Sequence, residues 1–211
     1  MNQNAVGKND LWDFSLRFVT PMVRRLLPEP GDAVALELGC GEGRRLGAAA
    51  HLFGRVIGVD SPEMIDLALS RPGRAENIEL VAREGLRLPV ESSSVDFVFT
   101  FDGLTHFESR DRFDAEVLEA ARVLKPGGTV MFWYGRITRL PFVINPVTWL
   151  RGISYSRDAA IPLKVQQSAM RWALRKARLR HRALSTPLHP DTSWRLFRGG
   201  DHSYATAVKQ R

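Results

Sequence analysis

Residues 36–43 are Leu-Glu-Leu-Gly-Cys-Gly-Glu-Gly and residues 56–60 are Val-Ile-Gly-Val-Asp, and these two stretches decide the fold of the chain. The apolar run over residues 33–38 has the length of a buried strand. The glycines after it permit a tight turn and a close approach of the backbone to a ligand. A second apolar strand over residues 55–60 ends in the carboxylate of Asp60. This order predicts a strand–turn–helix–strand unit that binds a nucleoside-containing cofactor at the turn.

The spacing of the glycines narrows the class of cofactor. A dinucleotide-binding turn needs a glycine three residues after its second glycine, and this chain has Arg44 there. Glu37 and Glu42 also place negative charge on both sides of the turn, which disfavours a pyrophosphate. The turn therefore suits a zwitterionic or cationic cofactor, with Asp60 placed to accept hydrogen bonds from ribose hydroxyls.

The pattern E-x-G-x-G-x-G resembles motif I of the class I S-adenosylmethionine-dependent methyltransferases. Further segments resemble later motifs of that family in the same order, namely residues 56–64, 83–89, 94–99 and 122–130. The resemblance spans roughly residues 30–135 and is nearest to the small-molecule branch that includes ubiquinone and menaquinone biosynthesis methyltransferases. A nucleotide-binding α/β domain of another kind is the alternative.

The resemblance implies which residues hold S-adenosylmethionine. The three glycines would contact its methionine part, Asp60 its ribose, and the segment containing Glu84 its adenine, which Met64 and Leu86 would sandwich. Plainer roles exist for some of these residues, since Cys40 can be a small buried hydrophobe and Asp60 a helix cap. The expected cofactor-binding residues are Glu37, Gly39, Cys40, Gly41, Gly43, Asp60, Ser61, Met64, Glu84, Gly85 and Phe101.

The catalytic groups are expected after the strand over residues 95–101, because open α/β sheets bind ligands at the carboxyl ends of their strands. Methyl transfer requires an aligned acceptor and removal of its proton. His106 is the best candidate base, and one helical turn would place Asp102 on the same face. The alternative is that His106 only caps or packs the following helix. His202, beside Asp201, is a weaker second candidate.

The composition bounds the class of protein. A chain of 211 residues fits one domain, and its one cysteine excludes a disulfide framework or a cysteine zinc cluster within the chain. Its histidines show no metal-ligand spacing, so no metal site is predicted. There is no apolar leader and no apolar run near roughly twenty residues, so we expect a soluble cytoplasmic protein.

The predicted fold is a Rossmann-like, seven-stranded, mostly parallel sheet with helices on both faces and a C-terminal antiparallel hairpin. The periodicity predicts strands over residues 33–38, 55–60, 77–82, 95–101 and 129–134, and helices over 43–53, 62–70, 112–124 and 162–182. A helix over residues 10–27 carries Pro21, which is expected to break or kink it, and residues 194–197 and 203–208 are expected to form the hairpin. The single domain over 1–211 divides into an N-terminal helix (1–30), a cofactor-binding core (31–135), a substrate-side insert (136–160) and a basic helix with the hairpin (161–211).

Charge is unevenly distributed along the chain. Residues 1–135 hold 15 Lys and Arg against 20 Asp and Glu, whereas residues 136–211 hold 15 against 3. Three interpretations of the basic helix stay open: a plain solvated face, a binding surface for an anionic acceptor, and a binding surface for an anionic membrane. The apolar insert segment over residues 140–150 lies beside it in the sequence and suits an amphiphilic molecule.

Together these observations favour a methyltransferase that acts on an oxygen of a small or lipid-linked, anionic acceptor. Two other functions stay open, a non-catalytic cofactor-binding interaction protein and an RNA methyltransferase. The turn at residues 101–104 lacks the Asn/Asp-Pro-Pro-aromatic pattern of methyltransferases that modify nitrogen atoms of nucleic-acid bases, which disfavours that group. Peripheral contact with a membrane is expected if the basic helix binds anionic lipid.

Overall fold

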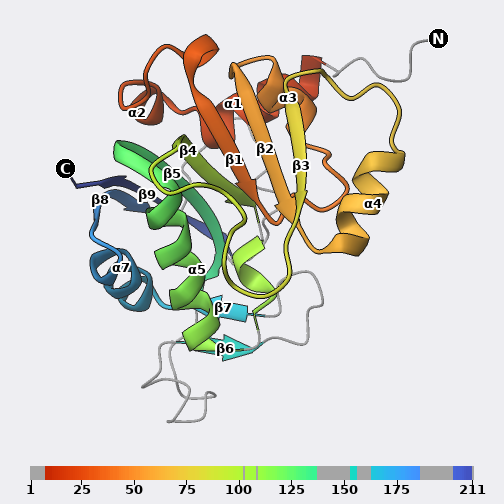
Figure 1. The fold of residues 1–211 in the computed structure, drawn as a ribbon. Helices are drawn as coiled ribbons and strands as arrows, with labels where there is room; N and C mark the ends of the chain where they lie inside the picture. The colour runs from red at the N-terminus through yellow and green to blue at the C-terminus, as the bar shows by residue number, and fades with distance from the viewer. Residues whose placement is uncertain are drawn as a thin grey trace.

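A computed structural model describes residues 8–101, 103–107, 109–136, 153–155, 163–185 and 202–210. Within them, nine strands form one sheet (Figure 1). The five longer parallel strands follow the order β3-β2-β1-β4-β5. Their bounds are β1 (Val34–Leu38), β2 (Arg55–Asp60), β3 (Ile78–Ala82), β4 (Val95–Phe101) and β5 (Leu124–Arg136).

The central strand β1 lies between β2 and β4, and it is parallel to both. The chain therefore reverses its direction of travel across the sheet between β3 and β4, and the crevice at such a reversal is where open α/β sheets bind ligands. Glu37 is opposite Gly58 of β2 and Phe99 of β4, so its position is the middle of this crevice.

The C-terminal part of the sheet is antiparallel. Strand β9 (His202–Lys209) pairs with β5 on one side and with β8 (Leu179–Ser185) on the other. The path β3-β2-β1-β4-β5-β9-β8 confirms the predicted seven-stranded, mostly parallel sheet with an antiparallel end. Two short strands, β6 (Ile153–Tyr155) and β7 (Leu163–Val165), add to it at the carboxyl end of β5.

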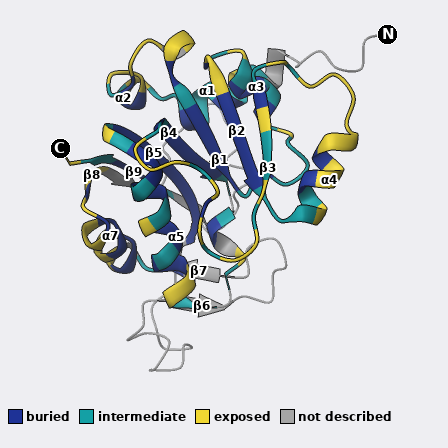
Figure 2. Cartoon of the chain, in the orientation of Figure 1, coloured by how far each residue is buried: buried dark blue, intermediate teal, exposed yellow. Residues whose placement is uncertain are grey.

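Helices cover both faces of the sheet, and each face has its own apolar cluster. The first cluster joins α1 (Lys8–Phe18), α2 (Pro21–Arg24), α3 (Leu46–Ala50) and α4 (Pro62–Ser70) to side chains such as Phe99. The second joins α5 (Arg110–Val123) and α7 (Gln167–Lys176) to side chains such as Phe132. Figure 2 shows the central strands buried between these layers. The remaining helices are the 3-10 turns η1 (Pro30–Asp32) and η2 (Gly103–Thr105).

The predicted N-terminal helix over residues 10–27 is two helices. The backbone leaves the helical conformation at Thr20, and Pro21 begins α2. The Thr20 side chain accepts a hydrogen bond from the Val23 amide (3.3 Å), which caps the new helix. Proline is tolerated in a first helical turn and not in a helix interior, which explains the break.

The predicted basic helix over residues 162–182 is shorter than expected. Only residues 167–176 are helical, and the flanking residues form β7 and β8. Arg178 has a φ of 55°, a left-handed conformation that ends helices and that side chains other than glycine rarely adopt. Leu179 then pairs with Lys209 of β9, so a distant strand overrides the local helical propensity.

Several predicted segments lie outside the described residues. They include most of the insert, the first hairpin strand at 194–197, Asp201 and Asp102. The strand that pairs with β9 is β8, so the antiparallel pair begins earlier in the chain than predicted. No helix among the described residues is long and apolar enough to cross a membrane.

Candidate functional site

The glycine turn after β1 is held against the end of β2. Gly39, Gly41 and Gly43 all have positive φ angles, of 68°, 53° and 76°. The amides of Gly39 and Cys40 both donate to the Val59 carbonyl, at 2.9 and 3.2 Å. An L side chain at any of these glycines would be strained, so the turn depends on glycine.

A fourth glycine, Gly103, allows the turn after β1 to approach the turn after β4. A Cβ built on Gly39 would lie 2.9 Å from the Cα of Gly103. A Cβ built on Gly103 would lie 2.5 Å from the Leu38 carbonyl oxygen. By contrast, a Cβ on Gly41 would meet nothing within 4 Å. Gly39 and Gly103 therefore allow the two turns to pack together, while Gly41 borders open space.

Asp60 joins the glycine turn to the start of α4. One carboxylate oxygen accepts from the Gly41 amide (2.6 Å) and the other from the Ser61 amide (2.7 Å). Ser61 is the N-cap of α4, although its side chain makes no capping hydrogen bond. Asp60 is half-buried, and each carboxylate oxygen can accept a further hydrogen bond, so it can still bind hydroxyl groups.

Glu37 is a fully buried carboxyl group at the centre of the crevice. Neither of its oxygens accepts a hydrogen bond from a described residue, and its side chain is 0 % exposed. Burial raises the pKa of Glu37 to about 8, with the Asp60 charge adding to this rise and the Arg45 charge opposing it. A buried carboxyl group without hydrogen-bond partners among the described residues is unusual, because burial of an unpaired polar group is costly.

Arg45, at the start of α3, contacts both Glu37 and Phe101. An Arg45 guanidinium nitrogen lies 3.9 Å from a Glu37 oxygen, and the guanidinium carbon lies 4.2 Å from the centre of the Phe101 ring. Phe101 ends β4 and packs against Phe18 of α1 and Trp133 of β5. A cation over an aromatic face is thus placed at the carboxyl ends of two neighbouring strands.

Helix α1 completes this part of the site. Its Arg17 lies over the rings of Phe101 and Trp133, at 5.4 and 5.7 Å, and pairs with Asp13 at 2.7 Å. The Trp133 indole donates to the Arg17 carbonyl (3.2 Å). The N-terminal helix is therefore fixed to the strands by polar contacts as well as by its apolar face, beside a hollow of about 180 Å³ lined in part by Asp13 and Arg45.

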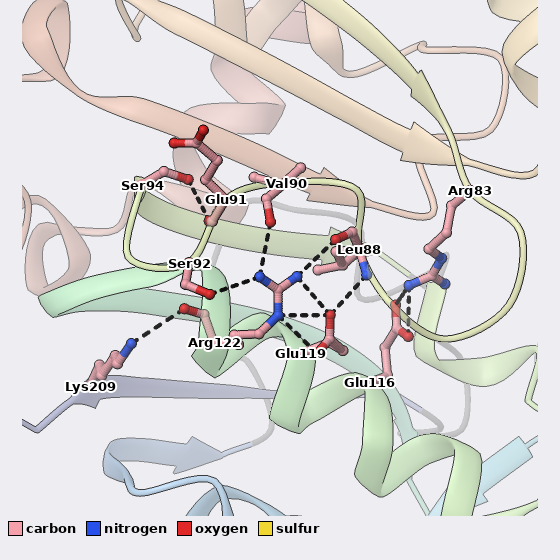
Figure 3. Close-up of polar contacts among 10 residues, drawn as sticks. All are labelled: Arg83, Leu88, Val90, Glu91, Ser92, Ser94, Glu116, Glu119, Arg122 and Lys209. Atoms are coloured by element: carbon pink, nitrogen blue, oxygen red, sulfur yellow. Dashed lines mark hydrogen bonds and ion pairs between the residues drawn. The ribbon is translucent and has the colours of Figure 1, made fainter.

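The segment after β3 contains the predicted adenine-contacting residues Glu84 and Gly85, both of which are exposed. Gly85 has a φ of 77°, and a Cβ there would meet nothing within 4 Å. Arg83 precedes them, and its side chain pairs with Glu116 of α5 through two hydrogen bonds (2.7 and 2.9 Å; Figure 3). Burial raises the pKa of Glu116, and the Arg83 charge opposes that rise.

Arg122 of α5 holds the rest of that segment, as Figure 3 shows. Its guanidinium donates to the carbonyls of Leu88 and Val90, to the Ser92 hydroxyl and to the carboxylate of Glu119. Glu119 also accepts from the Leu88 amide (2.8 Å). Burial acts to raise the pKa of Glu119, but the hydrogen bonds from Arg122 and Leu88 outweigh it and lower that pKa. The ion pair between Arg122 and Glu119 thus fixes the segment that contains the predicted adenine-contacting residues.

The predicted catalytic pair is placed only in part. His106 is exposed and directly follows the 3-10 turn η2 at the carboxyl end of β4. Asp102 lies outside the described residues. A 3-10 turn has about three residues per turn, so the spacing of four residues used to place Asp102 beside His106 does not carry over from an α-helix.

The other predicted residues near the cofactor are Cys40, Met64 and Leu86. Cys40 is buried, and burial together with the nearby Glu37 and Asp60 charges raises the pKa of its thiol. Met64 is half-buried in the first turns of α4 and Leu86 is half-buried in the segment after β3. No group of three or more metal-ligating side chains occurs in the described part of the chain.

Sequence reasoning missed Arg45, Arg17, Trp133, Gly103 and Arg122. Arg45 follows the glycine turn directly, but its approach to Glu37 depends on how α3 packs, which no sequence spacing reveals. Gly103 is a glycine in the turn after β4, and a glycine at that place is the sequence signal for a close approach between two turns. The other contacts join elements that are remote in the chain.

Comparison with known proteins identifies relatives of this chain. Residues 36–132 match the model of a family described as a methyltransferase domain. A demethylmenaquinone methyltransferase of Corynebacterium kroppenstedtii is 33 % identical over 122 residues, which is 58 % of this chain and 47 % of that protein. A tRNA (carboxymethyluridine(34)-5-O)-methyltransferase of Mus musculus is 29 % identical over 105 residues, which is 49 % of this chain and 15 % of that protein. The chain spans less than half the length of these curated relatives.

The fold has solved counterparts over nearly its whole length. A crystal structure described as that of an S-adenosylmethionine-dependent methyltransferase from Methanosarcina mazei has a TM-score of 0.67 and 21 % identity, and the match covers 90 % of this chain and 97 % of that chain. At this identity the likeness is one of fold.

Proposed function

This chain carries a class I S-adenosylmethionine-dependent methyltransferase domain, and we propose that it transfers the methyl group to an oxygen of a small or lipid-linked, anionic acceptor. The cofactor supplies the methyl group on a sulfonium centre. The acceptor and its atom are the proposed part, supported by the arginines Arg17 and Arg45 beside the aromatic rings at the carboxyl ends of β4 and β5.

The described residues fit this cofactor. Glu37 is a buried carboxyl group with no hydrogen-bond partner among the residues that the structure describes, which suits the ammonium group of a methionine moiety. Asp60 retains acceptor capacity for ribose hydroxyls. Gly41 and Gly85 border open space, where a side chain would occupy room that a ligand needs. We propose that these four residues, with Gly39, Gly43 and Met64, hold the cofactor.

The proposed base is His106. It stands after η2 at the carboxyl end of β4, and its exposed ring is accessible to an acceptor. A neutral imidazole removes a hydroxyl proton as the oxygen attacks the methyl carbon, and this usually contributes about 10²–10⁴-fold in rate. Replacing His106 with Ala should therefore lower turnover by that factor and leave the dissociation constant for S-adenosylhomocysteine within about twofold. Turnover close to that of wild type would make His106 a structural residue.

A small-molecule acceptor is supported by relatives such as the demethylmenaquinone methyltransferase. RNA is a second candidate, supported by a relative named as a tRNA methyltransferase and by the surface of α7 and β8. This basic surface consists of Arg171, Arg175, Lys176, Arg178, Arg180 and Arg182, all exposed. None of them forms an ion pair with a described residue, and residues 159–190 contain no Asp or Glu.

The packing of α7 weighs against a membrane surface as its partner. Ala169, Met170, Ala173 and Leu174 are buried in the cluster beneath the helix, so its apolar face is already used. Helices that lie on membranes bury such a face in the lipid. Trp172 is 51 % exposed, but one ring does not replace that face.

One labelling experiment separates the acceptors. Purified protein is incubated with S-adenosylmethionine carrying a labelled methyl group and with lipid, polar-metabolite and RNA fractions of host cells in parallel. Label in the lipid or metabolite fraction that depends on His106 supports the small acceptor. Label in the RNA fraction selects the second candidate, and binding of S-adenosylhomocysteine with no label in any fraction favours a non-catalytic cofactor-binding protein.

A further inference from the structure

The ionisable groups that face Glu37 include more acidic groups than basic ones. Its described neighbours that carry or can carry charge are Arg45 at the start of α3, Asp60 at the end of β2 and Cys40 in the glycine turn. Two of these three groups are acidic, so Arg45 is the cation that opposes them. Glu37 itself is fully buried and accepts no hydrogen bond within the described part of the chain.

Arg45 is held loosely in this role. The separation of 3.9 Å between its guanidinium nitrogen and the Glu37 oxygen is too long for a hydrogen bond. The guanidinium instead lies over the Phe101 ring, 4.2 Å from its centre. The side chain is 35 % exposed, so solvent can receive it if it leaves. A cation in this position can be replaced by one that approaches Glu37 more closely.

We propose that Arg45 is a replaceable counter-ion for Glu37, and that binding of S-adenosylmethionine substitutes the cofactor's ammonium group for Arg45, ionises Glu37 and releases its proton to solvent. This inference rests on the proposed function, because it requires S-adenosylmethionine as the ligand and Glu37 as the residue that receives its methionine end. The oxygen–hydrogen bond of the carboxyl group breaks, the carboxylate keeps the electron pair, and the buffer accepts the proton.

The electrostatics of the site agree with the exchange. Burial raises the pKa of Glu37 to about 8, so this group is largely protonated at pH 6.8 before a ligand binds. An ammonium group in direct contact favours the ionised form of a carboxyl group. The α-amino group of the ligand is itself mostly protonated at that pH, since such groups titrate near 7.7–8.0. Nearly one proton should therefore leave for each ligand bound.

Isothermal titration calorimetry with S-adenosylhomocysteine measures that proton. Titrations at pH 6.8 in phosphate and in imidazole, whose ionisation enthalpies differ, should give a release of about 0.9 proton per ligand from a group with a pKa of about 8. The Glu37→Gln variant should bind more weakly and release almost none. In contrast, 5′-methylthioadenosine lacks the ammonium group, so it should bind wild type without proton release.

The part assigned to Arg45 is tested at pH 8.0, where wild-type Glu37 is about half protonated. Arg45→Gln removes the opposing charge, so more Glu37 is protonated before the ligand binds. At this pH the α-amino group of the ligand takes up about half a proton on binding, because it titrates near 7.7–8.0. Net release should therefore be close to zero for wild type and should rise by up to about half a proton for Arg45→Gln. Arg44→Gln is the matched control, because the Arg44 side chain is 74 % exposed and pairs with Glu42. Its proton release should equal that of wild type.

The outcomes distinguish failure of the proposed function from failure of the proposed exchange at Glu37. If S-adenosylhomocysteine does not bind at all, the proposed function fails. If it binds wild type at pH 6.8 with no proton release, or if Glu37→Gln releases as much as wild type, the exchange is wrong although the function stands. Equal release by Arg45→Gln and wild type at pH 8.0 overturns the role of Arg45.

Discussion

Gly41 and Gly103 lie in neighbouring turns, and a methyl group would affect them differently. At Gly103 it would lie 2.5 Å from the Leu38 carbonyl oxygen, so the two turns would have to separate. At Gly41 it would meet nothing within 4 Å, although the φ of 53° makes an L residue strained. Gly103 therefore allows the two turns to pack together, and Gly41 leaves space open beside its turn.

This contrast predicts different defects in two alanine variants. Gly103→Ala should destabilise the fold by about 1–3 kcal/mol through overpacking, which lowers the melting temperature by several degrees. Gly41→Ala should cost about 1 kcal/mol of strain but weaken binding of S-adenosylhomocysteine more strongly, because its methyl group takes ligand space. Thermal melts and calorimetry on both variants measure this. Equal affinity of Gly41→Ala and wild type would place the ligand elsewhere.

Glu37 makes stability depend on pH even without a ligand. Its pKa rises from 4.5 in an exposed glutamate to about 8 in the folded protein. The folded state therefore binds a proton that the unfolded state has lost between these values. The stability from this group is complete below pH 4.5 and is lost as pH rises through about 8, at no more than about 1.4 kcal/mol per pH unit.

Glutamine cannot ionise, so Glu37→Gln should escape that loss. We expect the melting temperature of the variant, measured relative to wild type, to increase by several degrees between pH 5 and pH 8. Glu84→Gln changes an exposed glutamate and should keep a constant difference from wild type over the same range. A difference for Glu37→Gln that does not change with pH would show that Glu37 is ionised in the folded protein.

At the scale of elements, α5 supports the segment after β3 through Arg122. Its guanidinium satisfies two carbonyl groups of that segment and the carboxylate of Glu119 at 2.8–3.0 Å. Arg122→Gln removes the donors to both carbonyl groups and leaves Glu119 with the Leu88 amide, and we expect a loss of about 2–3 kcal/mol. Hydrogen exchange of the amides at residues 84–92 should become faster. Arg87→Gln is the control within the same segment, because Arg87 is exposed and makes no hydrogen bond with a described residue. Similar exchange in both variants would contradict the supporting role.

Element by element, the sequence predicted best where local pattern and tertiary pairing agree. The bounds of β2, β4 and α4 were predicted residue for residue, since each is an apolar or amphipathic run with clear ends. Residues 177–182 were predicted to be helical and instead turn at Arg178 into β8. Alanine, leucine and arginine favour a helix locally, and the pairing of β8 with a strand that begins at residue 202 is not visible in that pattern.

The site could be predicted in part for the same reason. The glycine turn and Asp60 form contacts over one βαβ unit, so their meeting at 2.6 Å follows from motif spacing. The approach of Arg45 to Glu37 and of Arg17 to Phe101 depends on how helices pack across the sheet. Those contacts follow from the shape of the whole domain, which the spacing of motifs does not encode.

For the molecule as a whole, charge separates the cofactor-binding half from the C-terminal half. Residues 136–211 carry 15 basic against 3 acidic residues, while residues 1–135 have the opposite balance. Helix α7, which carries Arg171, Arg175 and Lys176, lies on the opposite face of the sheet from α1 and α3 (Figure 1). Changing the basic surface should therefore alter the binding of anionic partners and not that of the cofactor.

Replacing Arg175, Lys176 and Arg180 with Gln removes three charges and keeps the strained residue Arg178 unchanged. We expect unchanged affinity for S-adenosylhomocysteine and weaker binding to RNA. If the three side chains contact phosphates, the slope of log affinity against log salt should fall by about 2–3, because each phosphate contact contributes about 0.7–0.9. The control variant replaces Arg25, Arg74 and Arg87, which are exposed elsewhere, and has the same net charge. If both variants bind RNA equally, only net charge matters, and the basic surface is an ordinary solvated face; if only the first loses affinity, the surface is a specific site for a polyanion.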